Sequence, residues 1–181
     1  LAEVGNVTAS GSGSAATINT AINNGSATDA LTLTLAAESV AATVLTSLDG
    51  KTSVALGAGS VTTHTGSLAA VKAVVDAGAT ITTNANYAAT IGDNADTALT
   101  ATNLSAVGGD TGGTVTVTNA VAISGSAVEA TAALVTDLTK VEAPTATLSI
   151  TGAITDYDVL DDILAEVGNV TASGSGSAAT I

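Results

Sequence analysis

Aspartates are the side chains of this 181-residue chain that could do chemistry, and the densest group lies in the phrase DYDVLDD. It contains Asp156, Asp158, Asp161 and Asp162. Oxygen-rich clusters are what calcium prefers as ligands. The other interpretation is a helix that begins after Asp156, whose positive N-terminal dipole the remaining carboxylates favour. Because charge runs are usually solvated faces, the helix is the simpler explanation, and Asp156, Asp158 and Asp162 stay as candidate calcium ligands.

Two glycine-containing segments carry further candidate calcium ligands. Asp93 and Asp96 lie in GDNAD, and Asp110 lies in GGDTGG. These segments share residues with calcium-binding nonapeptide turns without completing their pattern. Ordinary turns explain them equally well, since Gly, Asn and Asp tolerate the backbone conformations that turns need. Calcium is therefore the one cofactor that the sequence suggests.

Catalytic constellations do not emerge from the remaining residues. His64 is the only histidine, and in VTTHTG we expect it on a strand surface rather than as a general base. Tyr87 and Tyr157 are the only aromatic residues, too few for the aromatic platforms of a carbohydrate-active groove. The runs GSGSG and GGDTGG lack the Lys-Ser/Thr of a phosphate loop. We predict that the protein is not an enzyme.

Charge excludes two classes of partner. Sixteen acidic residues against three lysines give a net charge of −13. Nucleic-acid binding needs clustered Lys and Arg to replace counterions, and anionic lipid surfaces attract basic segments. No stretch reaches the roughly 18 uncharged apolar residues of a membrane span, so we expect no membrane insertion in this segment. The same negative charge would keep repeated copies solvated and apart.

The two ends of the chain have the same sequence. Residues 1–18 and 164–181 both read LAEVGNVTASGSGSAATI. Self-similarity at a fixed period is the signature of repeat architectures. We interpret residues 1–163 as one full repeat period and residues 164–181 as the start of the next, within a longer tandem array. The expected partners are neighbouring repeats of the same chain or identical chains.

A weaker rhythm of strand, cap and helix runs through the period. Thr114–Thr118 alternates with period two, as a half-buried strand does. Ser126 is the expected N-cap of a helix over residues 127–140. In the unit whose strand is expected to begin near Ser53, a helix containing Leu68 and Val71 is expected to end at Gly78.

The next unit repeats this order. Residues 145–150 form the expected strand, and Asp156 caps a helix over residues 157–167. Gly168 and Asn169 are expected to stop that helix. Strands of such units are expected to begin near residues 7, 31, 53, 80, 114, 145 and 170.

This rhythm predicts an α/β fold: a β/α solenoid of about six coils in each period, with a parallel strand wall and short Ala-rich helices. Stacked strands lie about 4.8 Å apart and packed helices roughly 8–10 Å apart, so a β/α stack must curve. Thr and Val are mediocre helix formers. An all-β solenoid is therefore the alternative that the sequence leaves open.

The long repeats, the acidic charge and the capped segments AVEATAALVTDL and DYDVLDDILAEV together resemble a known class. They are similar to the repeat arrays of giant cell-surface proteins in marine cyanobacteria and related bacteria, including the type required for flagella-independent swimming. The resemblance covers essentially the whole chain and rests on composition and rhythm. It implies an extracellular, surface-attached or released filament, and it transfers no site residues.

Two functions follow as hypotheses. The first is a structural segment of a long extracellular repeat protein that forms or contributes to a cell-surface filament. The second is a binding module on the same scaffold, either a calcium-dependent adhesin stalk or an ice- or surface-binding solenoid that uses rows of Thr such as those in Thr114–Thr118.

Overall fold

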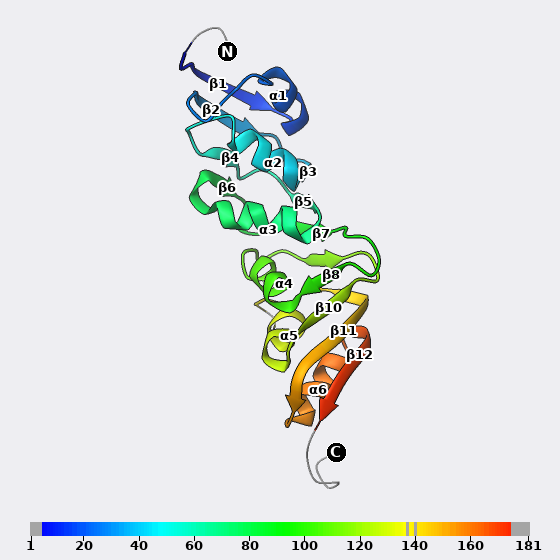
Figure 1. Ribbon diagram of the computed structural model, residues 1–181. Helices are drawn as coiled ribbons and strands as arrows, with labels where there is room; N and C mark the ends of the chain where they lie inside the picture. Colours follow the sequence, from blue (N-terminus) through cyan, green and yellow to red (C-terminus); the bar gives the residue numbers. More distant parts are fainter. Residues whose placement is uncertain (1–4, 137, 140, 175–181) are drawn as a thin grey trace. The chain divides into compact units, whose positions relative to one another are not determined.

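The computed structural model of the chain describes residues 5–136, 138–139 and 141–174. This part of the chain has an α/β fold with six short α-helices and three sheets of parallel strands (Figure 1). The chain divides into two compact units, Leu1–Ala89 and Thr90–Ile181. The α/β class expected from the sequence is confirmed, and the all-β alternative is wrong.

The first unit contains a parallel sheet with the strand order β1-β2-β4-β6. A helix lies between each strand of this sheet and the next. Strands β3 and β5 pair in parallel in a second sheet, and β7 follows β5 in the strand order of that sheet. The elements are β1 (Thr8–Gly13), α1 (Ala15–Ala21), β2 (Ala30–Leu35), β3 (Ser39–Ala41), α2 (Ala42–Asp49), β4 (Leu56–Ala58), β5 (Thr63–Gly66), α3 (Leu68–Ala77), the 3₁₀ turn η1 (Gly78–Thr80) and β6 (Ile81–Thr83), followed by β7 (Ala88–Ile91) at the division.

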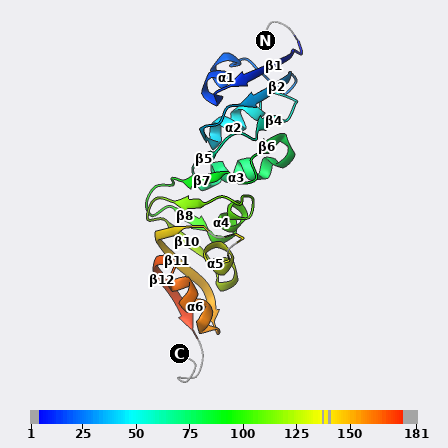
Figure 2. The same ribbon diagram turned by 180° about the vertical axis from the view of Figure 1, so that it is seen from behind.

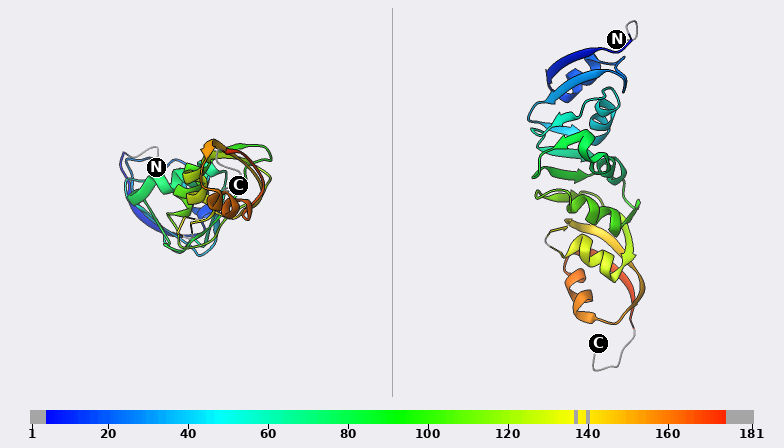
Figure 3. Two further views of the ribbon diagram at one scale, coloured as in Figure 1. Left: turned by 90° about the horizontal axis from the view of Figure 1, so that it is seen from below. Right: turned by 90° about the vertical axis from the view of Figure 1, so that its left-hand side faces the viewer.

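The second unit repeats the plan with the strand order β8-β10-β11-β12. Helices α4, α5 and α6 follow one another along one side of this sheet, and each contacts the next (Figures 2 and 3). The elements are β8 (Ala98–Thr100), α4 (Ala101–Gly108), β9 (Val115–Val117), β10 (Ala122–Ser126), α5 (Ala127–Leu134), β11 (Ala143–Ile154), α6 (Tyr157–Leu164) and β12 (Val167–Gly174).

The sheets β1-β2-β4-β6 and β8-β10-β11-β12 share one rule: the order of the strands in space is their order along the chain. Parallel neighbours need a crossover connection, and here each crossover contains one short helix. Each inner strand of these two sheets therefore meets the strand of the preceding turn on one edge and the strand of the following turn on the other.

The core consists mainly of aliphatic side chains. Along β2 the leucines Leu31, Leu33 and Leu35 are buried, whereas Thr32 and Thr34 are exposed. The helices bury Leu and Val at helical spacing, for example Leu68, Val71 and Val74 in α3. Small aliphatic side chains suffice because each turn buries its apolar face only against its neighbours.

Helix starts agree well with the sequence, and helix ends agree less well. Ser126 caps α5 in a reciprocal capping box with Glu129, and α3 ends at Gly78, which has a φ of 54°. The helix expected to run to residue 140 stops at Leu134. The helix expected over 157–167 stops at Leu164, because Val167 already pairs with Ala143 of β11.

Two further expectations need correction. Gly168 and Asn169 lie inside β12 rather than in a helix-terminating turn, since pairing with β11 extends through them. Between the strands expected near residues 80 and 114 the structure has two additional strands, β7 and β8, and a helix, α4. The spacing of apolar residues in this segment does not distinguish these short elements from the turns around them.

Candidate functional site

The acidic cluster of DYDVLDD forms the first turns of α6. Asp156 is the N-cap, and its Oδ1 accepts a hydrogen bond of 3.1 Å from the backbone N–H of Asp158. Asp161 and Asp162 lie further along the same helix. The capping role expected for Asp156 is confirmed. Carboxylates in the first turn also favour the helix dipole, so the cluster has a structural explanation.

The other predicted ligands lie in turns. The N–H of Asp96 donates to the carbonyl of Ala120 at 2.9 Å, and Asp96 has a left-handed backbone with a φ of 62°. The carbonyl of Asp93 accepts a 2.7 Å bond from the Asn119 amide. Asp110 follows α4, where its N–H donates to the carbonyl of Val107. The turn interpretation of both segments is thus confirmed.

Within residues 5–136, 138–139 and 141–174, no three His, Cys, Asp or Glu side chains lie where they could together hold a metal ion. The six aspartates that the sequence proposed are therefore not assembled into one group in this part of the chain. Calcium binding stays a prediction.

The most constrained carboxylate is one that sequence reasoning missed. Asp29 is 2% exposed. Its Oδ1 accepts a 2.8 Å bond from the N–H of Val7, and its Oδ2 accepts bonds from the N–H and hydroxyl of Ser26 at 2.9 and 3.0 Å. The backbone N–H groups of Val7 and Ser26, in that order, hold the pKa of Asp29 below its ordinary value. Ser and Asp three residues apart before a strand were the available signal.

Two glutamates cap helices. Glu38, just before β3, accepts a 2.6 Å bond from the N–H of Ala15, the first residue of α1 in the preceding turn. Glu129 of α5 accepts bonds from the N–H of Ser126 and from the hydroxyl of Thr102 in α4, both at 2.7 Å. The Ser126 N–H, followed by the Thr102 hydroxyl, lowers the pKa of Glu129.

Lys51 ties α2 to α1 in the same way. Its Nζ donates to the carbonyl oxygen and to Oδ1 of Asn19 at 2.9 and 2.7 Å. The charged and polar groups with the most partners thus join consecutive turns of the chain. Such bonds stabilise stacking and occupy donors and acceptors that a ligand would otherwise use.

His64 lies in β5, as expected, but it is fully buried and not on the strand surface. Its ring stacks on that of Tyr87, with the ring centroids 4.0 Å apart and an interplanar angle of 21°. Tyr87 is also fully buried. The pair fills the core of the first unit, where the few large side chains of this chain are most useful for packing.

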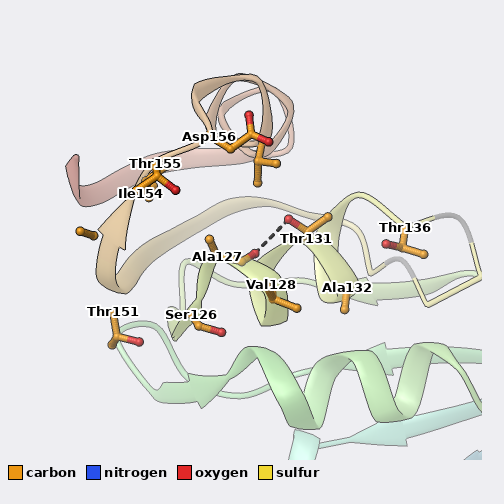
Figure 4. A pocket seen from close by; sticks show the side chains of 12 residues that line it. Ser126, Ala127, Val128, Thr131, Ala132, Thr136, Thr151, Ile154, Thr155 and Asp156 are labelled. Carbon is orange, nitrogen blue, oxygen red and sulfur yellow. Dashed lines mark hydrogen bonds between the residues drawn. The ribbon is translucent and has the colours of Figure 1, made fainter. Parts of the chain in front are cut away.

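An open groove of ≈ 650 Å³ lies in the second unit, between α5 and the end of β11 with the start of α6 (Figure 4). Val128, which is 79% exposed, Ala132 and Ile154 supply apolar lining. The hydroxyl of Thr131 already donates to the carbonyl of Ala127 at 2.9 Å. Among the residues that line the groove, the one carboxylate is that of Asp156, which caps α6.

Hydroxyl side chains form a row across the sheet of the second unit. Thr100 lies opposite Ser124, Ser124 opposite Ser149, and Ser149 opposite Thr171. The row therefore crosses β8, β10, β11 and β12, and three of its members are exposed to solvent. In the first unit, Ser10 and Ser12 similarly lie opposite the exposed Thr32 and Thr34.

The edge strands are the last candidate site. Among the described residues, β1 pairs with β2 and has no strand on its other edge, and β12 likewise pairs with β11 alone. Thr171–Gly174 of β12 has the same sequence as Thr8–Gly11 of β1. The repeated strand thus occurs twice: as β1 it pairs with the following strand, β2, and as β12 it pairs with the preceding strand, β11.

Comparison of the chain with protein-family models, with curated proteins and with solved structures finds no match. Over the part of the chain that the structure describes, none of the helices has the length and apolar character needed to cross a membrane.

Proposed function

We propose that this chain is a structural segment of a long extracellular repeat protein and that it forms or contributes to a cell-surface filament. Its turns would stack as a β/α solenoid, with residues 1–163 as one period and residue 164 beginning the next. The observation that carries the proposal is the pairing of the repeated strand with β11 in one copy and with β2 in the other.

Combining the two pairings of the repeated strand, with β11 and with β2, shows how such an array would extend from one period to the next. If β12 of one period is β1 of the next, the sheets β8-β10-β11 and β2-β4-β6 continue into each other through the shared strand. Backbone hydrogen bonds and the thin aliphatic core would then run along the whole array, and bonds such as those of Glu38 and Lys51 would tie each turn to the next. The net charge of −13 in each segment would keep neighbouring arrays solvated.

The architecture is tested by cryo-electron microscopy of a chain of three tandem periods. We expect continuous backbone density with the β11–β12 pairing repeated at each junction. Periods that appear as separate bodies joined by linkers would contradict the solenoid. The location is tested separately, by labelling intact source cells with antibodies against residues 5–136. Labelling only after the cells are broken open would contradict the extracellular role.

The hydroxyl row favours a second candidate function, binding of ordered water or a polar surface. Rows of hydroxyls at the strand spacing are able to organise water on a regular face. A measurement of ice recrystallisation inhibition decides this. Inhibition that Ser149→Lys abolishes would support the row as a binding face, whereas no activity, or activity that Lys at position 149 leaves intact, would rule it out. Lys at the exposed Val128 of helix α5, outside the hydroxyl rows, is the control.

A further inference from the structure

We propose that Asn24 is a site of spontaneous deamidation, in which the backbone nitrogen of Gly25 displaces the side-chain amide, and that the isoaspartate product loosens the stacking of the first turns. The reaction needs water and no enzyme. The inference concerns a covalent modification inside the first unit and does not depend on the proposed filament.

The pair Asn24–Gly25 combines the residues that favour this reaction. It is the one place in the 181-residue sequence where glycine follows asparagine. Glycine has no side chain to shield its backbone nitrogen, and it reaches backbone conformations that are closed to other residues. Asn24 is exposed in the turn between α1 and β2, so water reaches its amide.

The reaction has two steps. The deprotonated backbone nitrogen of Gly25 forms a bond to Cγ of Asn24, the bond from Cγ to Nδ2 breaks, and Nδ2 leaves as ammonia with the proton that Gly25 lost. Water then opens the cyclic imide at one of its two carbonyls. Breaking the bond from nitrogen to Cγ gives aspartate. Breaking the bond from nitrogen to the main-chain carbonyl carbon gives isoaspartate, whose main chain runs through the former side chain.

A hydrogen bond controls access to the attacking nitrogen. The N–H of Gly25 donates to the carbonyl of Ile22 at 2.8 Å, and the N–H of Ile22 donates to the carbonyl of Ile18 at the end of α1. A nitrogen held in this way attacks only after the turn has opened. Turns at helix ends open locally at a lower free energy than the whole fold. The folded chain therefore reacts at a rate set by the opening of this one turn.

The position of Gly25 is too crowded for the isoaspartate product. A Cβ at Gly25 would lie 3.1 Å from both the carbonyl oxygen of Ile22 and Cβ of Lys51, and 3.2 Å from the carbonyl oxygen of Lys51. Isoaspartate lengthens the main chain by one methylene group just before Gly25. Because added atoms in a tightly packed place force the backbone to shift, the turn changes shape when the product forms.

Two ties between consecutive turns flank the modified bond. On one side, Lys51 donates to Asn19 with bonds of 2.9 and 2.7 Å. On the other side, Ser26 donates to Asp29 through its N–H and its hydroxyl, and Asp29 binds the N–H of Val7. A shift of the turn acts on both ties, so we expect isoaspartate to weaken the stacking of the first turns.

Mass spectrometry of the full chain, incubated in warm and mildly alkaline buffer, tests the site. We expect modification at Asn24 and several-fold less at Asn86, which is also exposed in a turn but precedes Tyr87. Chain unfolded in urea should react at Asn24 several-fold faster than folded chain, because it lacks the bond to Ile22. Equal modification of the two asparagines in the folded chain would overturn the site.

Lys51→Met and Lys72→Met are a matched pair that tests the control by turn opening. Removing the tie of Lys51 to Asn19 should speed deamidation several-fold. Lys72 pairs with Asp76 four residues later in α3, and its loss should leave the rate unchanged. Equal rates in the two variants, or equal rates in folded and unfolded wild type, would overturn the control by turn opening.

Stability is measured on the isoaspartate form of the chain, separated by ion-exchange chromatography and identified by fragmentation. Asn24→Asp is the matched control, because it has the same added charge and a main chain of normal length. We expect the isoaspartate form to unfold at a lower urea concentration than Asn24→Asp. Equal midpoints would overturn the loosening. Asn24→Ser, which cannot form the imide, should keep its midpoint throughout the incubation, and a fall there would assign the loss to another site.

Discussion

Asp29 accepts a 2.8 Å hydrogen bond from the backbone N–H of Val7, and this bond joins the start of the first strand to the turn that begins the second. Val7 is the residue whose carbonyl accepts from Ala30, so Asp29 completes the backbone pairing where β1 begins. The carboxylate thus replaces a backbone carbonyl at the end of the ladder. It also makes the stacking of these two turns dependent on pH.

Asp29→Asn should lower stability at neutral pH and remove part of its pH dependence. The folded state lowers the pKa of Asp29, so its stabilisation is present above the unfolded pKa of about 4 and is lost as the pH falls through the folded value. We expect the difference in unfolding free energy between wild type and variant to be largest at pH 6–7 and to shrink below about pH 4.

Urea denaturation followed by circular dichroism from pH 3 to 7 measures this difference. Asp161→Asn, at an exposed position of α6, controls for the loss of one negative charge. A difference for the Asp29 variant that stays constant over the whole pH range would contradict the assignment.

Lys51→Met should destabilise the first unit by about 1–2 kcal/mol, because it removes two bonds from a charged donor to Asn19 while keeping most of the apolar stem. Lys72→Met is the matched control. Its partner Asp76 is a surface carboxylate in an i, i+4 pair, so we expect a change within about 0.5 kcal/mol. Chemical denaturation of both variants measures their losses in unfolding free energy and tests this difference. Equal losses would mean that the tie between α1 and α2 has no special weight.

Gly125→Ala tests the tight packing of β10 against α4. A Cβ at this position would lie 2.8 Å from Cβ of Ala101, and both are fixed by backbone. We expect a loss of about 1–3 kcal/mol in unfolding free energy, as for other overpacked contacts.

Gly59→Ala is the comparison, since its Cβ would meet nothing within 4 Å, and it should change stability by no more than about 0.5 kcal/mol. Thermal melts that rank the two variants in the opposite order would show that α4 moves to accommodate the added methyl group.

Asp156→Asn separates helix capping from calcium binding. Asn is as good an N-cap as Asp, so with capping alone the melting temperature should change by no more than about 2 °C. We expect that small change to be the same in EDTA and in millimolar calcium. If Asp156 were a calcium ligand, wild type would melt higher in calcium and the variant would lose that gain. Asp156→Ala, which removes the cap, should cost about 1 kcal/mol in both buffers.

Several features of the fold were readable from local sequence. The period-two alternation of Thr114–Thr118, the Ser126 cap and the stop at Gly78 depend on neighbours within a few residues. The α/β class followed from these signals. The identity of residues 1–18 with 164–181 is likewise a property of the sequence alone.

Tertiary structure decided everything that depends on the neighbouring turn. Val167 could have continued a helix, but pairing with Ala143 draws it into β12, and His64 is buried because Tyr87 from a later turn covers its ring. Asp29 gives no strong local signal, yet it is held by the N–H of Val7, 22 residues earlier. The sequence by itself determined the alternation of strands with capped helices over much of the chain and that one strand is repeated. Only the stacking of turns decided that Val167 pairs with Ala143, that His64 stacks on Tyr87 and that Asp29 binds Val7, since those contacts join residues far apart along the chain.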